Sequence, residues 1–204
     1  MRFLRCGEHA ILVELDSLDD VLGRYRALCR KPPTGSGDLV LASRTILVHF
    51  DPALTTVDHL MAEIADTPPL LGSDVSERLV EIPVKYDGED LDEVAGRSGL
   101  SVSEVIASHT GSELLAAFVG FAPGFCYITG LPEPLRLPRR DTPRTRVPAG
   151  AVALGGGYTA VYPRDSPGGW HVIGHTDESM WDIDADPPAL LTPGTRVRFA
   201  EVGA

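Results

Sequence analysis

The residues best suited to contact a small molecule surround a Pro-Gly turn in the middle of the chain. Residues 118–127 read Phe-Val-Gly-Phe-Ala-Pro-Gly-Phe-Cys-Tyr. Pro123 presets one turn dihedral and Gly124 supplies the positive one. Core packing is the simpler interpretation of the two rings before the turn, because buried rings usually stabilise a fold. For Phe125 and Tyr127, beyond the turn, the wall of a pocket is an equally good interpretation.

A short basic segment follows, and its arginines could bind an anion. Within eleven residues the chain carries Arg136, Arg139, Arg140, Arg144 and Arg146. Proline at 138 and 143 stiffens the segment against helix formation. One interpretation is a solvated loop that neutralises nearby acids, since surface ion pairs are common and weak. The other is a site for an anion or a docking partner, with Arg144 as the strongest candidate because Pro143 and Pro148 flank it.

Glycine-rich stretches at 155–157 and 166–170 bring turning backbone close to Trp170. Exposed amides in such turns can bind an oxyanion. The corners of a small barrel also need glycine for tight bending. Taken alone, the glycine runs favour barrel corners.

Three histidines are candidates for chemistry. On a strand, His171 and His175 share one face and could bind a metal if a third ligand, such as His109, came from elsewhere. Partly exposed histidines on a sheet edge are the simpler interpretation, and we predict that this chain binds no metal. His109 ends a predicted helix just before Thr110, where it could be a general base or a cation at the helix C-terminus.

Composition and missing motifs exclude several classes of function. The net charge of -11 disfavours nucleic acid and anionic membranes as partners. No apolar run approaches the roughly 18 residues of a membrane span, and three scattered cysteines fit neither a zinc site nor a disulfide framework. We therefore expect a cytoplasmic protein. The sequence contains no phosphate loop, nucleophile elbow or His-Glu-x-x-His helix, so we expect it to need a partner for catalysis.

The first 75 residues predict a small α+β domain. Apolar periodicity indicates strands at 10–15, 39–42 and 45–50, and helices that begin near Asp19 and at Val57. Two helices on one face of a small antiparallel sheet resemble a ferredoxin-like unit. Residues 66–77, rich in proline, glycine, serine and acid, are the predicted linker.

Residues 79–204 predict a mainly-β second domain. A strand at 79–84 is followed by short helices at 91–97 and 102–108, the second with a capping box formed by Ser101 and Glu104. From Leu114 onward, short strands are divided by glycine and proline. This pattern is typical of a barrel or closed sheet.

Ordered motifs in the second half resemble one family. They are Phe118 to Tyr127, Gly130-Leu131-Pro132, Pro138-Arg139, Pro143-Arg144, Val147-Pro148-Ala149-Gly150, Tyr162-Pro163, Ser166 to Trp170 and Ile173-Gly174. The resemblance is to the first-subunit family of allophanate hydrolase, with the B subunit of 5-oxoprolinase, the KipI-type inhibitor of a sporulation histidine kinase and related domains of urea carboxylase. It covers most of residues 80–204. His175 departs from the arginine that is more common in the family, so ligand preference is expected to differ.

The resemblance implies a ferredoxin-like N-terminal domain, a cyclophilin-like C-terminal barrel and a larger second subunit as partner. It also implies ATP-dependent opening of 5-oxoproline to glutamate, with ATP used together with the partner subunits and a third subunit involved. Two alternatives stay open: a binding module that inhibits a histidine kinase, and a subunit that acts on allophanate or urea-derived substrates.

Carried over position by position, the resemblance also implies site residues. His109 and Arg144 are the expected catalytic residues. The expected lining of the cleft is Phe121, Pro123, Gly124, Phe125, Tyr127, Pro143, Ser166, Pro167, Gly168, Gly169 and Trp170.

Overall fold

The computed structural model describes residues 1–70 and 78–203, and the chain divides into two compact units, Met1–Asp74 and Val75–Ala204. Of the predicted linker, residues 71–77 lie outside the described residues, and Asp66 is the last residue of a helix.

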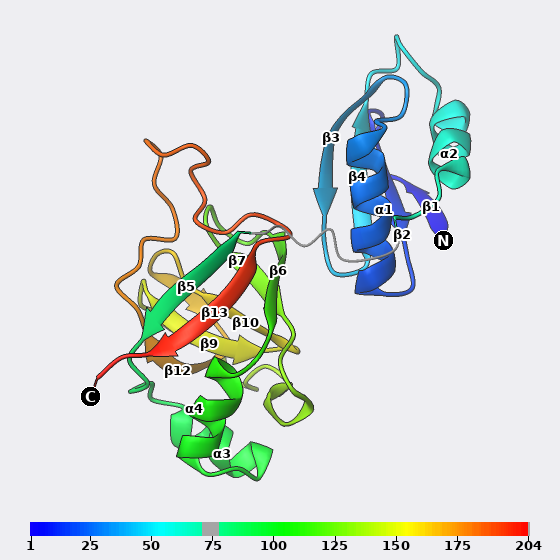
Figure 1. Cartoon of the computed structure of the whole chain (residues 1–204). Coiled ribbons are helices and arrows are strands. Elements are labelled where there is room, and N and C mark those ends of the chain that lie inside the picture. Colours follow the sequence, from blue (N-terminus) through cyan, green and yellow to red (C-terminus); the bar gives the residue numbers. More distant parts are fainter. Residues whose placement is uncertain (71–77, 204) are drawn as a thin grey trace. The chain divides into compact units, whose positions relative to one another are not determined.

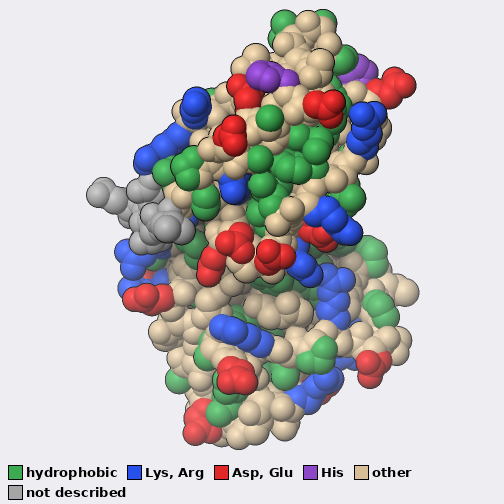
Figure 2. Space-filling view, turned by 90° about the vertical axis from the view of Figure 1, so that its right-hand side faces the viewer, with side chains coloured by type: hydrophobic (Ala, Val, Ile, Leu, Met, Phe, Trp, Pro, Cys, Tyr) green, Lys and Arg blue, Asp and Glu red, His purple; other side chains and the backbone are tan. Residues whose placement is uncertain are grey.

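No helix in the described ranges is long and apolar enough to cross a membrane. Figure 2 shows acidic and basic side chains interspersed over the visible face.

The first unit is a four-stranded antiparallel sheet with two helices (Figure 1). In the order β1-β2-β4-β3, its strands are β1 (Arg2–Arg5), β2 (Ala10–Glu14), β4 (Thr45–Phe50) and β3 (Ser36–Leu41). The helices are α1 (Leu18–Arg30) and α2 (Val57–Asp66), begun by the side-chain caps Ser17 and Thr56. They are neighbours, because Arg24 of α1 donates a hydrogen bond to the carbonyl of Ile64. The ferredoxin-like assignment stays a prediction.

The second unit is built around a seven-stranded, nearly closed sheet in the order β12-β9-β10-β7-β6-β13-β5. Its strands are β5 (Leu79–Val84), β6 (Leu114–Val119), β7 (Cys126–Thr129), β9 (Ala151–Gly155), β10 (Tyr158–Val161), β12 (His171–His175) and β13 (Arg196–Glu201). Lys85 and His175 exchange two backbone hydrogen bonds of 2.9 Å, which join the two edge strands. The mainly-β, barrel-like prediction is confirmed, whereas the cyclophilin-like assignment stays a prediction.

Two helices lie beside the barrel: α3 (Leu91–Ser98) and α4 (Val102–Thr110), drawn in green in Figure 1. The predicted capping box of α4 is present, since Ser101 accepts from the Glu104 amide and Glu104 accepts from the Ser101 amide. A short 3-10 turn, η1 (Glu133–Leu135), follows β7. These elements contribute to the barrel core.

The strands of the barrel bury side chains on both faces. Alternation in β9 sends Val152 and Leu154 into the barrel core, and Ala151 and Ala153 into a second apolar cluster on the other face. That second cluster is rich in aromatic rings. It also contains Val147 from a separate two-stranded ribbon formed by β8 (Arg144–Val147) and β11 (Ser166–Gly168). The aromatic cluster therefore lies outside the barrel core, between the sheet and the ribbon.

Candidate functional site

Five aromatic rings of this second face surround a small pocket: Phe121, Phe125, Tyr127, Tyr162 and Trp170. The Phe125 ring lies at the centre, with its centroid 5.1 Å from Phe121 and Tyr127, 5.4 Å from Tyr162 and 5.7 Å from Trp170. All four contacts are edge-to-face, an arrangement that aromatic quadrupoles favour. The rings therefore hold one another in fixed orientations.

We call this site the aromatic pocket; it has a volume of about 110 Å³. Its lining is completed by Arg139, Pro167, Gly168 and Gly169. The structure thus brings together the predicted ring residues on both sides of the Pro-Gly turn and the predicted residues that precede Trp170. Sequence reasoning had not selected Arg139 or Tyr162, although both stand in motif dipeptides, Pro138-Arg139 and Tyr162-Pro163.

Two glycines are required by the rings that pack against them. A Cβ added at Gly155 would lie 2.7 Å from Cγ of Trp170, and one at Gly168 would collide with the Tyr162 hydroxyl oxygen. Glycine at these positions lets the indole and the phenol lie directly on the backbone. The glycine-rich stretches therefore shape the aromatic pocket.

Phe121 has an unusual backbone conformation. Its φ of 69° is positive, a region that bulky residues rarely adopt, and its side chain is 58% exposed. Such a conformation costs on the order of 1–3 kcal/mol and persists where the surrounding structure imposes it, often at functional sites. The ring lies at the boundary between the aromatic pocket and a neighbouring groove.

That groove, which we call the apolar groove, has a volume of about 370 Å³. It contains the predicted site residues Pro123 and Gly124, with Val119 and Trp181 also in its lining. A Cβ at Gly124 would lie 2.8 Å from the Trp181 Cβ, so the turn packs closely against the long loop after β12. Pro123 and Gly124 are therefore next to the aromatic pocket rather than in it.

Arg139 is the available cation of the aromatic pocket. Among the residues that the structure describes it forms no hydrogen bond or ion pair, whereas Arg136 donates to the Leu131 carbonyl at 2.7 Å and Arg146 to Asp165 at 2.8 Å. Burial raises the pKa of the Tyr162 hydroxyl, and the nearby charge of Arg139 acts in the opposite direction. An anion in the pocket would meet an unpaired guanidinium.

Arg144, the predicted anion contact, is engaged elsewhere. Its guanidinium donates two hydrogen bonds to Asp90, of 2.7 and 2.8 Å, and its Nε lies 2.8 Å from a carboxylate oxygen of Glu89. Charge-assisted contacts of this bidentate kind are among the stronger ones in proteins. The interpretation of a loop that neutralises nearby acids describes Arg144 better than a ligand contact does.

His109, the predicted general base, lies in the barrel core. It is fully buried, its ring nitrogens lie 2.7 Å from the Tyr86 hydroxyl and 2.9 Å from the Thr159 hydroxyl, and its ring stacks on Phe199 at 4.4 Å. Burial lowers the pKa of His109 to about 3, so the folded protein keeps it neutral. Because it does not line the pocket, this geometry gives no support to a catalytic role.

The other predicted residues lie at the edge of the pocket. Ser166 is buried in the β8–β11 ribbon opposite Val147, and its hydroxyl donates to the Arg164 carbonyl. Pro143 is close to Gly169, since a Cβ there would lie 3.6 Å from the proline ring. Within the described ranges, no three His, Cys, Asp or Glu residues are grouped to hold a metal ion.

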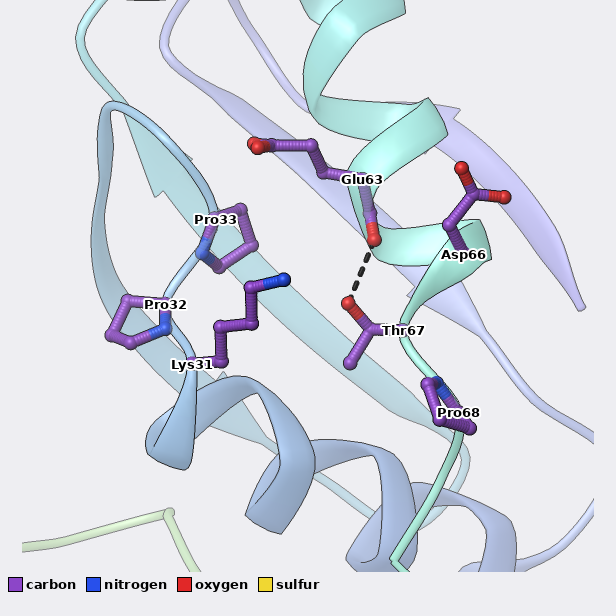
Figure 3. Close-up of a pocket in the computed structure, with 7 residues that line it drawn as sticks. All are labelled: Lys31, Pro32, Pro33, Glu63, Asp66, Thr67 and Pro68. Atoms are coloured by element: carbon purple, nitrogen blue, oxygen red, sulfur yellow. Dashed lines mark hydrogen bonds between the residues drawn. The ribbon is translucent and has the colours of Figure 1, made fainter.

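The first unit has its own pocket of about 270 Å³ between the ends of its two helices (Figure 3). Its lining consists of Lys31, Pro32, Pro33, Glu63, Asp66, Thr67 and Pro68. The polar groups there bond locally: Thr67 donates to the Glu63 carbonyl at 2.8 Å, and the Glu63 carboxylate accepts from Thr34. None of the predicted site residues lies there.

Comparison with known proteins decides the family. Residues 1–191 match the family described as carboxyltransferase domain, subdomain C and D. The chain belongs to this family. The resemblance recognised from the ordered motifs is thereby confirmed.

Within the family, the chain is similar to proteins named as the B subunit of 5-oxoprolinase. That of Escherichia coli O157:H7 is 50% identical over 125 residues, which are 60% of this chain and 57% of the relative. That of Haemophilus influenzae is 42% identical over 159 residues, 76% of this chain and 72% of the relative. The crystal structure of TTHA0988 is 38% identical, with a TM-score of 0.80, over 96% of this chain and 40% of that one. The match to the Escherichia coli relative thus spans less than two thirds of its length.

Proposed function

We propose that this family member is a subunit of an ATP-dependent amide-hydrolysing complex of the 5-oxoprolinase kind, which opens 5-oxoproline to glutamate. In this proposal the aromatic pocket binds the substrate or its phosphorylated intermediate. The observation that carries it is the unpaired Arg139 beside five converging rings. The names of the relatives support the choice of reaction.

The chemistry of the pocket suits this substrate. 5-Oxoproline is a small cyclic amide with one carboxylate, and a guanidinium pairs with a carboxylate through two parallel hydrogen bonds. Ring edges from Phe125 and Trp170 would contact the flat lactam. A volume of about 110 Å³ lies well below the roughly 300–1,000 Å³ of pockets for drug-sized ligands, so the pocket suits a ligand the size of an amino acid.

The same pocket does not fit ATP. Its volume is small, Arg139 is its single cationic side chain, and the sequence has no phosphate loop. We therefore assign ATP and the hydrolytic step to a larger second subunit, with a third subunit taking part. This chain would hold and orient the substrate at the interface.

The apolar groove supports such a partner. Val119, Phe121 and Trp181 expose 41%, 58% and 37% of their surface there, and contiguous exposed apolar surface marks interaction sites. The region equivalent to this chain forms 40% of TTHA0988, so one relative carries it joined to additional protein. A partner docked on the groove would also cover the mouth of the aromatic pocket beside Phe121.

The test is reconstitution with the second and third subunits. We expect ATP-dependent release of glutamate from 5-oxoproline by the mixture and none by this chain alone. Arg139→Ala should lower kcat/KM by about 10- to 100-fold, the size expected for a charged hydrogen bond. Arg146→Ala, an exposed arginine of the same segment, is the matched control and should leave activity unchanged.

The outcomes separate the parts of the proposal. A mixture that acts on allophanate but not on 5-oxoproline would move the substrate to the urea-derived class. Full activity of Arg139→Ala would contradict the role of the pocket. If this chain bound a purified histidine kinase and did not bind the second subunit, the alternative would be favoured, in which the chain is a kinase-inhibiting binding module that uses the same apolar groove.

A further inference from the structure

We propose that Asp90 is a positioning residue that aims Arg139 into the aromatic pocket by clamping the arginine loop, residues 138–144, at Arg140 and Arg144. The inference rests on the proposed role of Arg139 as the ligand contact. Asp90 itself lies outside the pocket and touches no ligand.

The carboxylate of Asp90 is a hub between three parts of the barrel unit. It is 3% exposed, and its two oxygens accept the paired hydrogen bonds of Arg144. One oxygen also accepts from the Arg140 guanidinium, and the other from the Val172 amide at 2.7 Å. The Asp90 amide donates in turn to the Val172 carbonyl at 3.0 Å. One buried side chain therefore ties β12 to Arg140 and Arg144 of the arginine loop.

The position of Asp90 makes this arrangement informative. Asp90 is the N-cap residue of α3, where an aspartate side chain ordinarily accepts a hydrogen bond from the first helical turn. Here no such side-chain bond forms, and the carboxylate faces the arginine loop instead. Instead of capping the helix, the carboxylate bonds to Arg140 and Arg144, which are 50 and 54 residues away in the sequence.

The residues on either side of Arg139 are fixed to the pocket wall. Nε2 of the buried His171 lies 3.0 Å from the Pro138 carbonyl, and the Arg140 amide donates to the Gly169 carbonyl at 2.7 Å. Gly169 and His171 flank Trp170, a wall of the aromatic pocket. The Arg140 guanidinium also lies 3.1 Å from Glu93. The side chain of Arg139 itself has no hydrogen-bond or ion-pair partner among the described residues.

Removing the charge of Asp90 should loosen the arginine loop. Burial alone raises the pKa of the Asp90 carboxyl, but hydrogen bonds from Arg144 and Val172 and the charges of both arginines outweigh it and hold that pKa below its ordinary value. Asp90 is therefore ionised at neutral pH. Asp90→Asn keeps the size of the side chain and removes the charge that both guanidinium groups need.

The first experiment measures how firmly the arginine loop is held, and it needs no substrate. The full-length chain is treated briefly with trypsin, and cleavage after Arg139 and Arg140 is followed by mass spectrometry. Asp90→Asn should increase the cleavage rate at these bonds at least about 10-fold, because cleavage requires local opening of the loop. Asp92→Asn, an exposed acid in the first turn of the same helix, is the control and should cleave like the wild type. Equal rates for Asp90→Asn and wild type would overturn the clamp.

The second experiment tests whether Asp90 acts through Arg139, in the reconstituted complex. Asp90→Asn should raise KM for 5-oxoproline about 10-fold with kcat little changed, since a small misplacement of a contact is costly. In an Arg139→Ala background the same change should alter KM less than about 2-fold, because coupled residues are not additive. Equal losses in both backgrounds would show a purely structural role.

A third variant keeps the proposal testable if Asp90→Asn folds poorly. Arg140→Gln leaves Asp90 bound to Arg144 and Val172 but removes the contact next to Arg139. Because trypsin does not cleave after glutamine, only the bond after Arg139 is followed in this variant, and it should show both faster cleavage at that bond and the raised KM. Wild-type behaviour of this variant would overturn the inference. If the wild-type complex fails on 5-oxoproline, the proposed function fails, while the cleavage experiment still decides the clamp.

Discussion

Replacing His109 with glutamine should flatten the pH dependence of the stability of the barrel. His109 is fully buried between Tyr86, Thr159 and Phe199, and burial lowers its pKa to about 3. In the unfolded chain a histidine has a pKa of about 6.5. Between these values the unfolded state binds a proton that the folded state does not, so stability falls as the pH falls.

The size of the effect follows from the two pKa values. Well below pH 6.5 the contribution of one such group approaches about 1.4 kcal/mol per pH unit. Between about pH 6.5 and about pH 4.5 it amounts to about 2 kcal/mol, a large share of the roughly 5–15 kcal/mol that stabilises a typical domain. Glutamine cannot be protonated, so His109→Gln should lose this part of the pH dependence, whatever its stability at neutral pH.

Urea unfolding at several pH values, followed by tryptophan fluorescence, measures this effect. Both tryptophans, Trp170 and Trp181, belong to the second unit, so the signal reports on the barrel. The control is His175→Gln, an exposed histidine of the same unit, which should not flatten the curve. If His109→Gln lost stability on acidification as steeply as the wild type, the neutral, buried state of His109 would be refuted.

Three further substitutions test local features by urea unfolding. Gly155→Ala should destabilise the barrel by about 1–3 kcal/mol, because its Cβ would lie 2.7 Å from Cγ of Trp170; an unchanged stability would contradict this packing. Phe121→Asn should raise stability by up to about 1 kcal/mol, since asparagine tolerates positive φ, and should weaken binding to the second subunit; a loss of stability would argue against strain. Ser101→Ala should cost about 1 kcal/mol through the lost cap, with Ser103→Ala as the milder control.

The elements were predictable because their signals are local. The strand Thr45–Phe50 has the predicted bounds, and the capping box of Ser101 and Glu104 is formed as its spacing indicates. The closure of the barrel could not be predicted from local sequence patterns. It depends on the pairing of Lys85 with His175, two residues far apart in the chain, and short-range periodicity carries no information on such pairs.

The site was predictable in kind but not in every residue. Phe125 and Tyr127 stood out as a possible pocket wall because a turn and its flanking aromatics form a recognisable local pattern. The glycines before Trp170 were expected in the cleft only through the family resemblance, since the glycine runs alone favoured barrel corners. The structure favours Arg139 over the predicted Arg144, a choice that local rules could not make because all five arginines of the segment look alike and their partners lie elsewhere. The burial of His109 could not be predicted from the sequence either, because a position at a helix end does not indicate whether the side chain is buried. In the structure, Phe199 stacks on the His109 ring and helps to bury it.

The availability of Arg139 is itself informative in a chain with a net charge of -11. The acids that contact the other arginines of this loop are already engaged. Asp90 is enclosed by two other arginines and a backbone amide, Glu89 pairs with Arg144, and Glu93 contacts Arg140. An incoming anion would therefore meet Arg139 without displacing an internal carboxylate. Binding then costs no broken internal ion pair, which is the physical reason to assign the ligand contact to Arg139 rather than to Arg144.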